Sequence, residues 1–394
     1  MSTATVRAAA VLTPTTHDLD GFAGALFADK PLAEPHFIDV LHGSATRCLD
    51  AADARHARRV AARSATPAQT AAVVALRCVR EAALSAAELS ECALIVAGNN
   101  LAMRYQARTV LDDESGARRV RPTHAVTHLD TDVIGVVSEL LDLRAEGWTV
   151  GAASASGAVA VIQAMRLLAL GAAPRCLVVA PAAELSDTEI RALRASGALH
   201  PEPDAVCRPF DELRQGFVPR PAAAAVVLEP AEQGLAVLLG AGQRLDARRG
   251  AAPDRSGQAA AMRSALAAAG LSPADIGYVN AHATGSEAGD RSEADALAEV
   301  FGIDSGPLVN SSKGLLGHAL SAAGLVELIA SVVQLRQGRA HSNAATTRPM
   351  AGIGGRLIGR DALPLDRRVA MTNSFGFSGV NAAIVLADEG EWRR

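Results

Sequence analysis

The segment GLVELIASVVQLRQG, residues 324–338, is an apolar run between two glycines with the spacing of a helix of about four turns. A second run of the same length, GAVAVIQAMRLLALG, occupies residues 157–171. A Gly-Phe pair follows each run, and each pair precedes an apolar segment, AAVVLE ending at residue 229 or AAIVLA ending at residue 387. We interpret these similarities as an internal duplication, and the alternative is a chance likeness between Ala-rich helices.

Short runs rich in Val, Ile and Leu alternate with longer Ala/Leu segments that have helical spacing. The predicted strands are 93–97, 176–180, 224–228, 276–280, 369–372 and 382–386. This alternation predicts an α/β fold whose strands are buried on both faces. The predicted halves are residues 1–230 and 231–394. The charged stretch 104–124 is expected to be a surface loop or cap, and 242–257 a polar connection between the halves.

The composition excludes several classes of function. The chain has 394 residues, is 49% hydrophobic and 3% aromatic, and has a net charge of -4. A pI near 6.2 without a basic run argues against nucleic acid as a partner. The apolar stretch 315–335 contains a histidine, a glutamate and glycines, so we expect a buried helix and not a membrane span. No secretory signal is visible at the start, and five cysteines without metal-site spacing suit a reducing compartment. We therefore expect a cytoplasmic protein that binds no metal.

Polar residues stand out where apolar elements begin or end. GAASASG, residues 151–157, directly precedes an apolar helix, where backbone N–H groups are suited to an oxyanion. The alternative is that Ser154 and Ser156 only cap that helix. YVNAHATGSEAGD, residues 278–290, places His282 in a loop after a predicted strand.

A third segment, NSSKGLLGHALSAAG at residues 310–324, contains Lys313 and His318. A lone histidine is more often a core residue than a catalyst, and a lone lysine usually reaches solvent. Lys313 is nevertheless one of only two lysines among 38 basic residues. Glu327, on the helix that follows, is a plausible buried partner for it, because an unpaired ammonium would be costly there.

In order and spacing, these segments resemble the motifs of the β-ketoacyl synthases, the condensing enzymes of fatty acid and polyketide synthesis. RPFD at residues 208–211, with the Gly-Phe pair at 216–217, and NSFGFSGVN at residues 373–381 add to the resemblance. It is weakest before about residue 98. The resemblance implies a duplicated thiolase-like fold, with two similar βαβαβ halves in α-β-α-β-α layers.

The resemblance places Ser154 where the condensing enzymes carry a cysteine. A serine hydroxyl starts from too high a pKa for a helix N-terminus alone to ionise it, so uptake of an acyl chain is disfavoured. His282 and His318 match the two histidines that donate N–H bonds to a thioester enolate. The chain therefore resembles the non-elongating, decarboxylating ketosynthases with serine at this position that accompany polyketide β-branching cassettes.

The resemblance assigns further roles. It matches Ser154 and Phe377 to an oxyanion hole, and Phe377 also to a gate over the acyl pocket. Thr284 and Ser286 match hydroxyls that bind the pantetheine arm. The residues expected to order or support the site are Lys313, Glu327, Asp290, Asn373, Gly376 and Gly379. Ala283 replaces a family glycine, and Pro221-Ala222 stands where the family often has GEGA.

The expected activity is decarboxylation of malonyl-acyl carrier protein to acetyl-acyl carrier protein without condensation. One alternative is a serine acyltransferase or hydrolase, in which His282 or His318 activates Ser154. Another is an inactive partner subunit like a chain-length factor, although such subunits have usually lost both histidines. The expected partners are an acidic carrier protein and a second copy of the chain, with a heterodimer as the alternative. No diffusible cofactor is expected, because the substrate is carried on phosphopantetheine.

Overall fold

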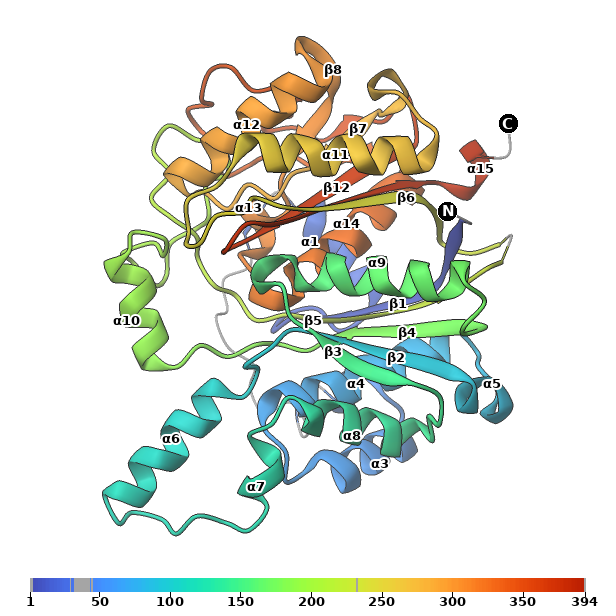
Figure 1. Cartoon of the computed structure of the whole chain (residues 1–394), viewed down its shortest axis with the longest axis vertical. Coiled ribbons are helices and arrows are strands. Elements are labelled where there is room, and N and C mark those ends of the chain that lie inside the picture. The colour runs from blue at the N-terminus through green and yellow to red at the C-terminus, as the bar shows by residue number, and fades with distance from the viewer. Residues whose placement is uncertain (1–2, 29, 32–42, 44, 232, 393–394) are drawn as a thin grey trace.

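The computed structural model describes residues 3–28, 30–31, 43, 45–231 and 233–392 as alternating layers of helix and sheet. Two helices cover one outer face, α11 (Arg255–Ala269) and α12 (Glu287–Phe301), and α3 (Ala51–Ala61), α4 (Thr66–Glu81) and α8 (Thr131–Leu141) cover the other. Between the two sheet layers lie α9 (Ser156–Ala169) and α14 (Ala323–Gln337) (Figure 1). The molecule thus has the α-β-α-β-α layering of the thiolase-like fold.

The strands form one hydrogen-bonded order, β10-β8-β7-β12-β13-β6-β1-β5-β4-β2-β3. Their bounds are β1 Ala4–Leu12, β2 Cys92–Ala97, β3 Gly147–Val150, β4 Arg175–Ala180, β5 Ala223–Glu229, β6 Ala236–Leu245, β7 Tyr278–Asn280, β8 Ile303–Asn310, β10 Gly355–Leu357, β12 Val369–Gly376 and β13 Val380–Ala387. In the series β3-β2-β4-β5-β1, the first two neighbouring pairs are parallel and the last two are antiparallel. The series β8-β7-β12-β13-β6 has the same order of two parallel and then two antiparallel pairs. The duplication inferred from sequence is therefore present in the strand topology.

The two central helices cross at the glycines that begin the two repeated segments. A Cβ on Gly157 would lie 2.4 Å from the amide nitrogen of Leu325, and one on Gly324 would lie 2.6 Å from that of Ala158. Such separations are shorter than any ordinary contact, so glycine is what lets the helices approach this closely. Because both helices are buried here, their sequences are apolar on nearly every side.

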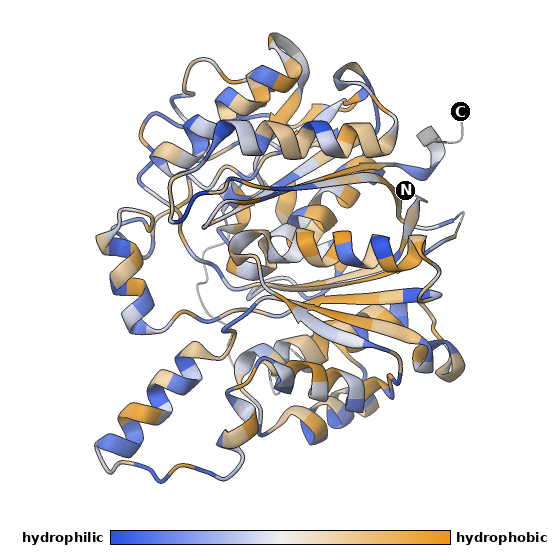
Figure 2. Cartoon of the chain, viewed as in Figure 1, coloured by the Kyte–Doolittle hydropathy of each residue, from blue (hydrophilic) through white to orange (hydrophobic). Residues whose placement is uncertain are grey.

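All six strands predicted from sequence are present, but two segments differ from their predictions. Residues 104–124 are not simply a loop, because α6 (Met103–Glu114) covers their first half. No residue of α6 is buried, and the helix projects from the body, so it lacks the apolar stripe that identifies a helix in sequence (Figures 1 and 2).

The segment 242–257 does not connect the halves. It contains the end of β6, a loop over residues 246–254 and the start of α11, all within the second half. At Gly242, the first residue of this segment, a Cβ would lie 2.2 Å from the Ala261 carbonyl oxygen. That glycine is required by the close packing of α11 on β6 and does not mark a turn.

The predicted buried helix at 315–335 is mainly α14, preceded by α13 (Lys313–Leu316) and the short turn η4 (Leu320–Ala322). All five cysteines are buried. In the described part of the chain, no helix combines the length and hydropathy needed to cross a membrane.

Candidate active site

The predicted site segments meet at the carboxyl ends of strands from both halves. The turn with Ser154 follows β3, the loop with His282 follows β7, His318 follows β8 and α13, and Phe377 follows β12. Strands β7, β8 and β12 are parallel to one another, so their carboxyl ends share an edge of the sheet. This is the edge at which α/β sheets place their ligands.

A tight turn between β3 and α9 presents Ser154. The short turn η2 (Ala153–Ala155) carries it, and Ala153 has a φ of +48°, in the left-handed region. Ser156 holds the turn: its Oγ accepts from the Ala152 amide at 2.8 Å and donates to the Ala153 carbonyl at 2.7 Å. Ser156 is therefore the structural serine of this segment, whereas the half-buried Ser154 lines a cavity.

The geometry around His318 identifies which ring nitrogen carries the proton. Its Nδ1 accepts from the Leu320 amide at 3.0 Å, and its Nε2 lies 3.0 Å from Ser154 Oγ. Burial, with a smaller effect of the Lys313 charge, lowers the pKa of His318 well below its usual value. The ring is thus neutral at pH 7, with its single proton on Nε2. His318 therefore donates to Ser154 and does not act as a base toward it.

Lys313 determines which ring nitrogen of His282 carries the proton, as the Leu320 amide does for His318. The Lys313 ammonium lies 3.4 Å from His282 Nδ1 and donates to the His282 carbonyl oxygen at 2.7 Å. Burial first, and then the charges of Lys313 and His318, lower the pKa of His282 well below its usual value. Because the ammonium faces Nδ1, the neutral ring carries its proton on Nε2. The two imidazole rings stand 5.8 Å apart at 85°.

Lys313 also forms an ion pair with Glu327, as its position in the sequence suggested. The two side chains are 1% and 3% exposed. Burial raises the pKa of Glu327 to about 7, although the neighbouring ammonium acts in the opposite direction. The pair holds the ammonium next to His282, and removing either partner would leave a buried charge without compensation.

Two buried carboxyl groups fix the loop that carries His282. Asp290 Oδ1 accepts from the amides of Thr284 and Gly285, and its Oδ2 accepts from the Phe210 amide in the RPFD segment. Burial raises the pKa of Asp290 to about 7. Asp290 thus ties the histidine loop to a segment of the first half.

Sequence reasoning missed the second carboxyl group, Glu293. Its two oxygens accept from the amides of His282 and Ala283, at 2.9 and 2.7 Å, and Asn373 donates to it at 3.1 Å. The available clue was that Glu293 lies one helical turn after Asp290, on the same face of α12. Asn373 therefore acts through Glu293 on the loop that presents His282.

A cavity of about 720 Å³ brings most of the predicted residues together. Its lining includes Ser154, His282, Thr284, Ser286, Asp290, His318, Gly376 and Phe377. The Thr284 hydroxyl donates to that of Ser286 at 3.1 Å, so the two form one polar group on the wall. Aromatic rings flank the imidazoles: Phe217 is 4.9 Å from His318, and Phe375 is 5.8 Å from His282. These rings reduce access of water to the histidines.

The loop that carries Phe377 lies directly against the serine turn. A Cβ on Gly376 would lie 2.4 Å from the Ala152 carbonyl oxygen, and Gly379 has a φ of +74°. Glycine is thus required at both positions, by close approach and by conformation. The Phe377 side chain is 42% exposed, as a residue at a cavity mouth would be. Its gating and oxyanion-hole roles stay predictions.

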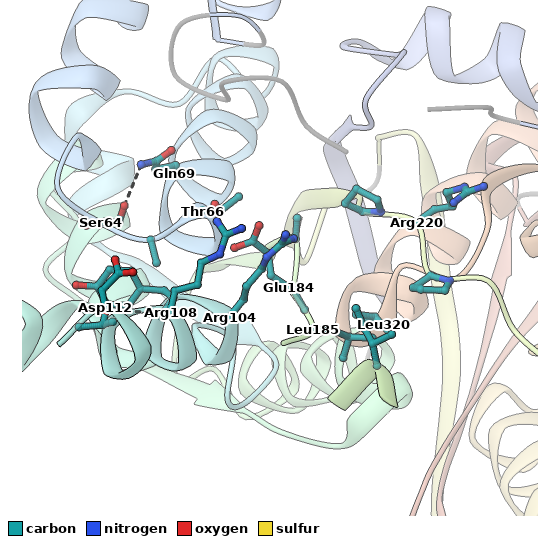
Figure 3. Close-up of a pocket in the computed structure, with 18 of the residues that line it drawn as sticks. Ser64, Thr66, Gln69, Arg104, Arg108, Asp112, Glu184, Leu185, Arg220 and Leu320 are labelled. Carbon is teal, nitrogen blue, oxygen red and sulfur yellow. Dashed lines mark hydrogen bonds between the residues drawn. The ribbon is translucent and has the colours of Figure 1, made fainter. Parts of the chain in front are cut away.

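A second, larger cavity of about 1010 Å³ opens between α6, the start of α4 and residues 182–185 (Figure 3). Its lining is charged, with Arg104, Arg108, Arg220 and Glu184. It shares Ala183, Glu184, Leu185 and Leu320 with the first cavity but contains none of the predicted site residues. The smaller cavity, and not the larger one, therefore has the chemical groups of an active site.

Comparison with known proteins assigns the class. Residues 40–234 match the N-terminal domain of beta-ketoacyl synthase, and residues 235–347 match its C-terminal domain. The chain belongs to the β-ketoacyl synthase family.

Individual relatives narrow the comparison. The chain is 30% identical to the polyketide biosynthesis malonyl-ACP decarboxylase PksF of Bacillus subtilis (strain 168), over 91% of each chain. Two solved structures share the fold. The ishigamide ketosynthase/chain length factor has a TM-score of 0.86 at 24% identity, covering 98% of this chain and 99% of that one. A type II polyketide ketosynthase in complex with its acyl-carrier protein has a TM-score of 0.83 at 21% identity, with the same coverage.

Proposed function

We propose that the protein decarboxylates malonyl-acyl carrier protein to acetyl-acyl carrier protein in polyketide biosynthesis, without condensation. The observation that carries this proposal is that His282 and His318 both have Nδ1 facing a donor, so both rings present Nε2–H to the same cavity. The similarity to PksF, over nearly the whole of both chains, supports the same activity.

In this mechanism the pantetheine arm enters past Thr284 and Ser286, and the thioester oxygen lies between the two imidazole N–H groups. The bond from C2 to the carboxylate breaks, carbon dioxide leaves, and the electron pair passes into the thioester to form an enolate. The two N–H groups stabilise the negative oxygen that develops. Such a donor typically contributes about 100- to 1000-fold in rate. Phe217 and Phe375 strengthen this effect, because fewer water molecules compete for the oxygen.

A serine acyltransferase is the second candidate, since Ser154 Oγ lies within hydrogen-bond reach of His318. It is disfavoured because the Leu320 amide occupies Nδ1 of His318, so Nε2 holds the proton and cannot accept another from Ser154.

The test is incubation of the purified protein with malonyl-loaded carrier protein, followed by mass spectrometry of both proteins. The proposal expects a carrier-protein mass lower by one carbon dioxide and no acyl group on the enzyme. A stable acyl adduct on Ser154 would support the acyltransferase instead. No turnover, together with tight binding to a second ketosynthase, would support a partner subunit.

We also propose that the partner in catalysis is an acidic carrier protein and that the protein forms a homodimer. The loop 246–254 supports the first proposal. Gly250, Ala251, Ala252 and Pro253 line the cavity, and the adjacent Arg248 and Arg249 are exposed. Arg248 is paired with Asp254 at 3.5 Å, so Arg249 is the positive charge at the entrance that would attract an acidic partner.

A further inference from the structure

Decarboxylation without condensation leaves a chemical requirement that two histidine donors do not meet. After carbon dioxide leaves, C2 of the enolate carries the reactive electron pair and must receive a proton before acetyl can form. In a condensing enzyme C2 would instead attack an acyl carbon held on the nucleophile. Ser154 occupies that nucleophile position, so its hydroxyl lies where an electrophile for C2 is needed.

The hydrogen bond to His318 orients the Ser154 hydroxyl as a donor. Since His318 Nε2 carries the ring proton, the 3.0 Å contact uses a lone pair of Ser154 Oγ and not its hydrogen. Among the described residues this is the only hydrogen bond of the Ser154 side chain. Its O–H hydrogen is therefore available to a group in the cavity.

The cavity lining that contains Ser154 also includes two polar side chains, Ser321 and Asn99. Ser321 is 8% exposed and lines the cavity, and its hydroxyl has no hydrogen-bond partner among the described residues. It belongs to η4, which packs on the turn η2 that carries Ser154. Asn99 also lines the cavity, and its Oδ1 lies 2.6 Å from where a Cβ on Gly151, just before this turn, would be. The Asn99 amide and the Ser321 hydroxyl together are suited to hold water in the cavity.

We propose that the Ser154 hydroxyl protonates C2 of the enolate, and that water held by Asn99 and Ser321 returns a proton to the serine. This inference rests on the proposed function. The O–H bond of Ser154 breaks as the C2–H bond forms with the enolate electron pair, and the thioester carbonyl is restored. The serine oxygen then takes a proton from water, and solvent neutralises the hydroxide. Overall, one solvent proton is consumed for each carbon dioxide released.

A fixed donor protonates only one face of the enolate, and this can be measured with malonyl itself. Freshly prepared malonyl-carrier protein, stereospecifically labelled with deuterium at C2 and with carbon-13 at the thioester carbon, is turned over in tritiated water. The methyl group of the acetyl product then contains all three hydrogen isotopes, and its handedness is determined after release as acetate. Release of carbon dioxide is followed in parallel.

Wild type is expected to give a methyl group of one handedness. Ser154→Ala should retain most carbon dioxide release but give a nearly racemic methyl group, because water then protonates either face. Ser154→Thr, which keeps a hydroxyl, should preserve the handedness. Ser90→Ala, in the exposed helix α5 (Ala86–Ser90), is the matched control and should change neither quantity.

The outcomes separate this inference from the proposed function. A racemic product from wild type, or unchanged handedness in Ser154→Ala, would overturn the role of Ser154 and leave the decarboxylase intact. Loss of carbon dioxide release in Ser154→Ala would contradict the decarboxylation mechanism, which needs no nucleophile. No release by wild type would overturn both proposals.

Discussion

At the scale of single residues, function depends on which nitrogen of each histidine carries a proton. The replacement His318→Ala removes one of the two N–H donors and should lower the rate of carbon dioxide release about 100- to 1000-fold. His318→Gln, whose amide can still donate, should recover part of the loss. His56→Ala, on the outer helix α3, is the control. Equal loss in the Ala and Gln variants would argue that His318 does more than donate a hydrogen bond.

The lowered pKa values of His282 and His318 predict the pH dependence of the reaction. A histidine whose pKa is lowered stays neutral as the pH falls through 6.5, and gains a proton only below its lowered pKa. Between pH 8 and pH 6 the two donors should therefore be unchanged, and any change in kcat/KM on carrier-bound malonyl near pH 7 should come from Glu327 and Asp290, whose pKa values burial raises to about 7. An inflection near pH 6.5 that persists in Glu327→Gln and in Asp290→Asn would mean that one ring titrates normally and would favour its action as a base.

How far the site could be predicted differs from residue to residue. Motif spacing indicated His282, His318, Lys313 and Ser154. The structure places Ser154 and the two histidines in the lining of one cavity, and Lys313 in contact with His282. Sequence could not show the Leu320 amide at Nδ1 of His318, because that contact depends on a left-handed φ of +54° at Leu320. The sequence also could not indicate the partners of Glu293, because its three contacts with amide groups form only after α12 docks.

At the scale of elements, the crossing of α9 and α14 positions the serine turn against the histidine segments. Gly157→Ala would place a Cβ 2.4 Å from the Leu325 amide nitrogen, and should reduce the free energy of unfolding by about 1–3 kcal/mol. Gly135→Ala is the matched control, because nothing lies within 4 Å of the added Cβ on α8. Alanine there should be neutral or stabilising, by up to about 1 kcal/mol. Urea unfolding checks both, and equal effects would contradict the crossing geometry.

The loop 246–254 should act in docking and not in chemistry. Reversing the charge with Arg249→Glu is expected to raise KM for malonyl-carrier protein severalfold while kcat is kept, because the rim charge acts on association. Malonyl-pantetheine, which lacks the carrier protein, is the control substrate and should be unaffected. Added salt should shrink the difference between wild type and variant. A change in kcat on both substrates would place Arg249 in the site itself.

At the scale of the whole molecule, buried carboxyl groups should make stability depend on pH. The folded protein holds Asp290 with a pKa of about 7, above the usual 3.8, so it binds a proton that the unfolded chain releases between those values. The stability of wild type relative to Asp290→Asn should therefore fall as the pH rises from about 4 to 7. Thermal unfolding at several pH values checks this. A difference in Tm that does not vary with pH would show that Asp290 is ionised throughout.

The duplicated architecture was predictable because each half repeats a buried helix and a strand of similar sequence. The strands β1, β3, β6, β8 and β10 of the main sheet were not predicted. The pairing of β1 with β6 that joins the halves is non-local, so neighbouring sequence does not indicate it. The division near residue 230 and the homodimer stay predictions. The projecting helix α6, none of whose residues is buried, is the clearest case in which a helix could not be predicted from periodicity.

The most direct measurement of the central claim is the mass of both proteins after wild type is incubated with malonyl-carrier protein. The account predicts that malonyl is converted to acetyl on the carrier protein while the enzyme keeps its own mass. An enzyme that gains an acyl group on Ser154, or a carrier protein that remains malonylated, would contradict it.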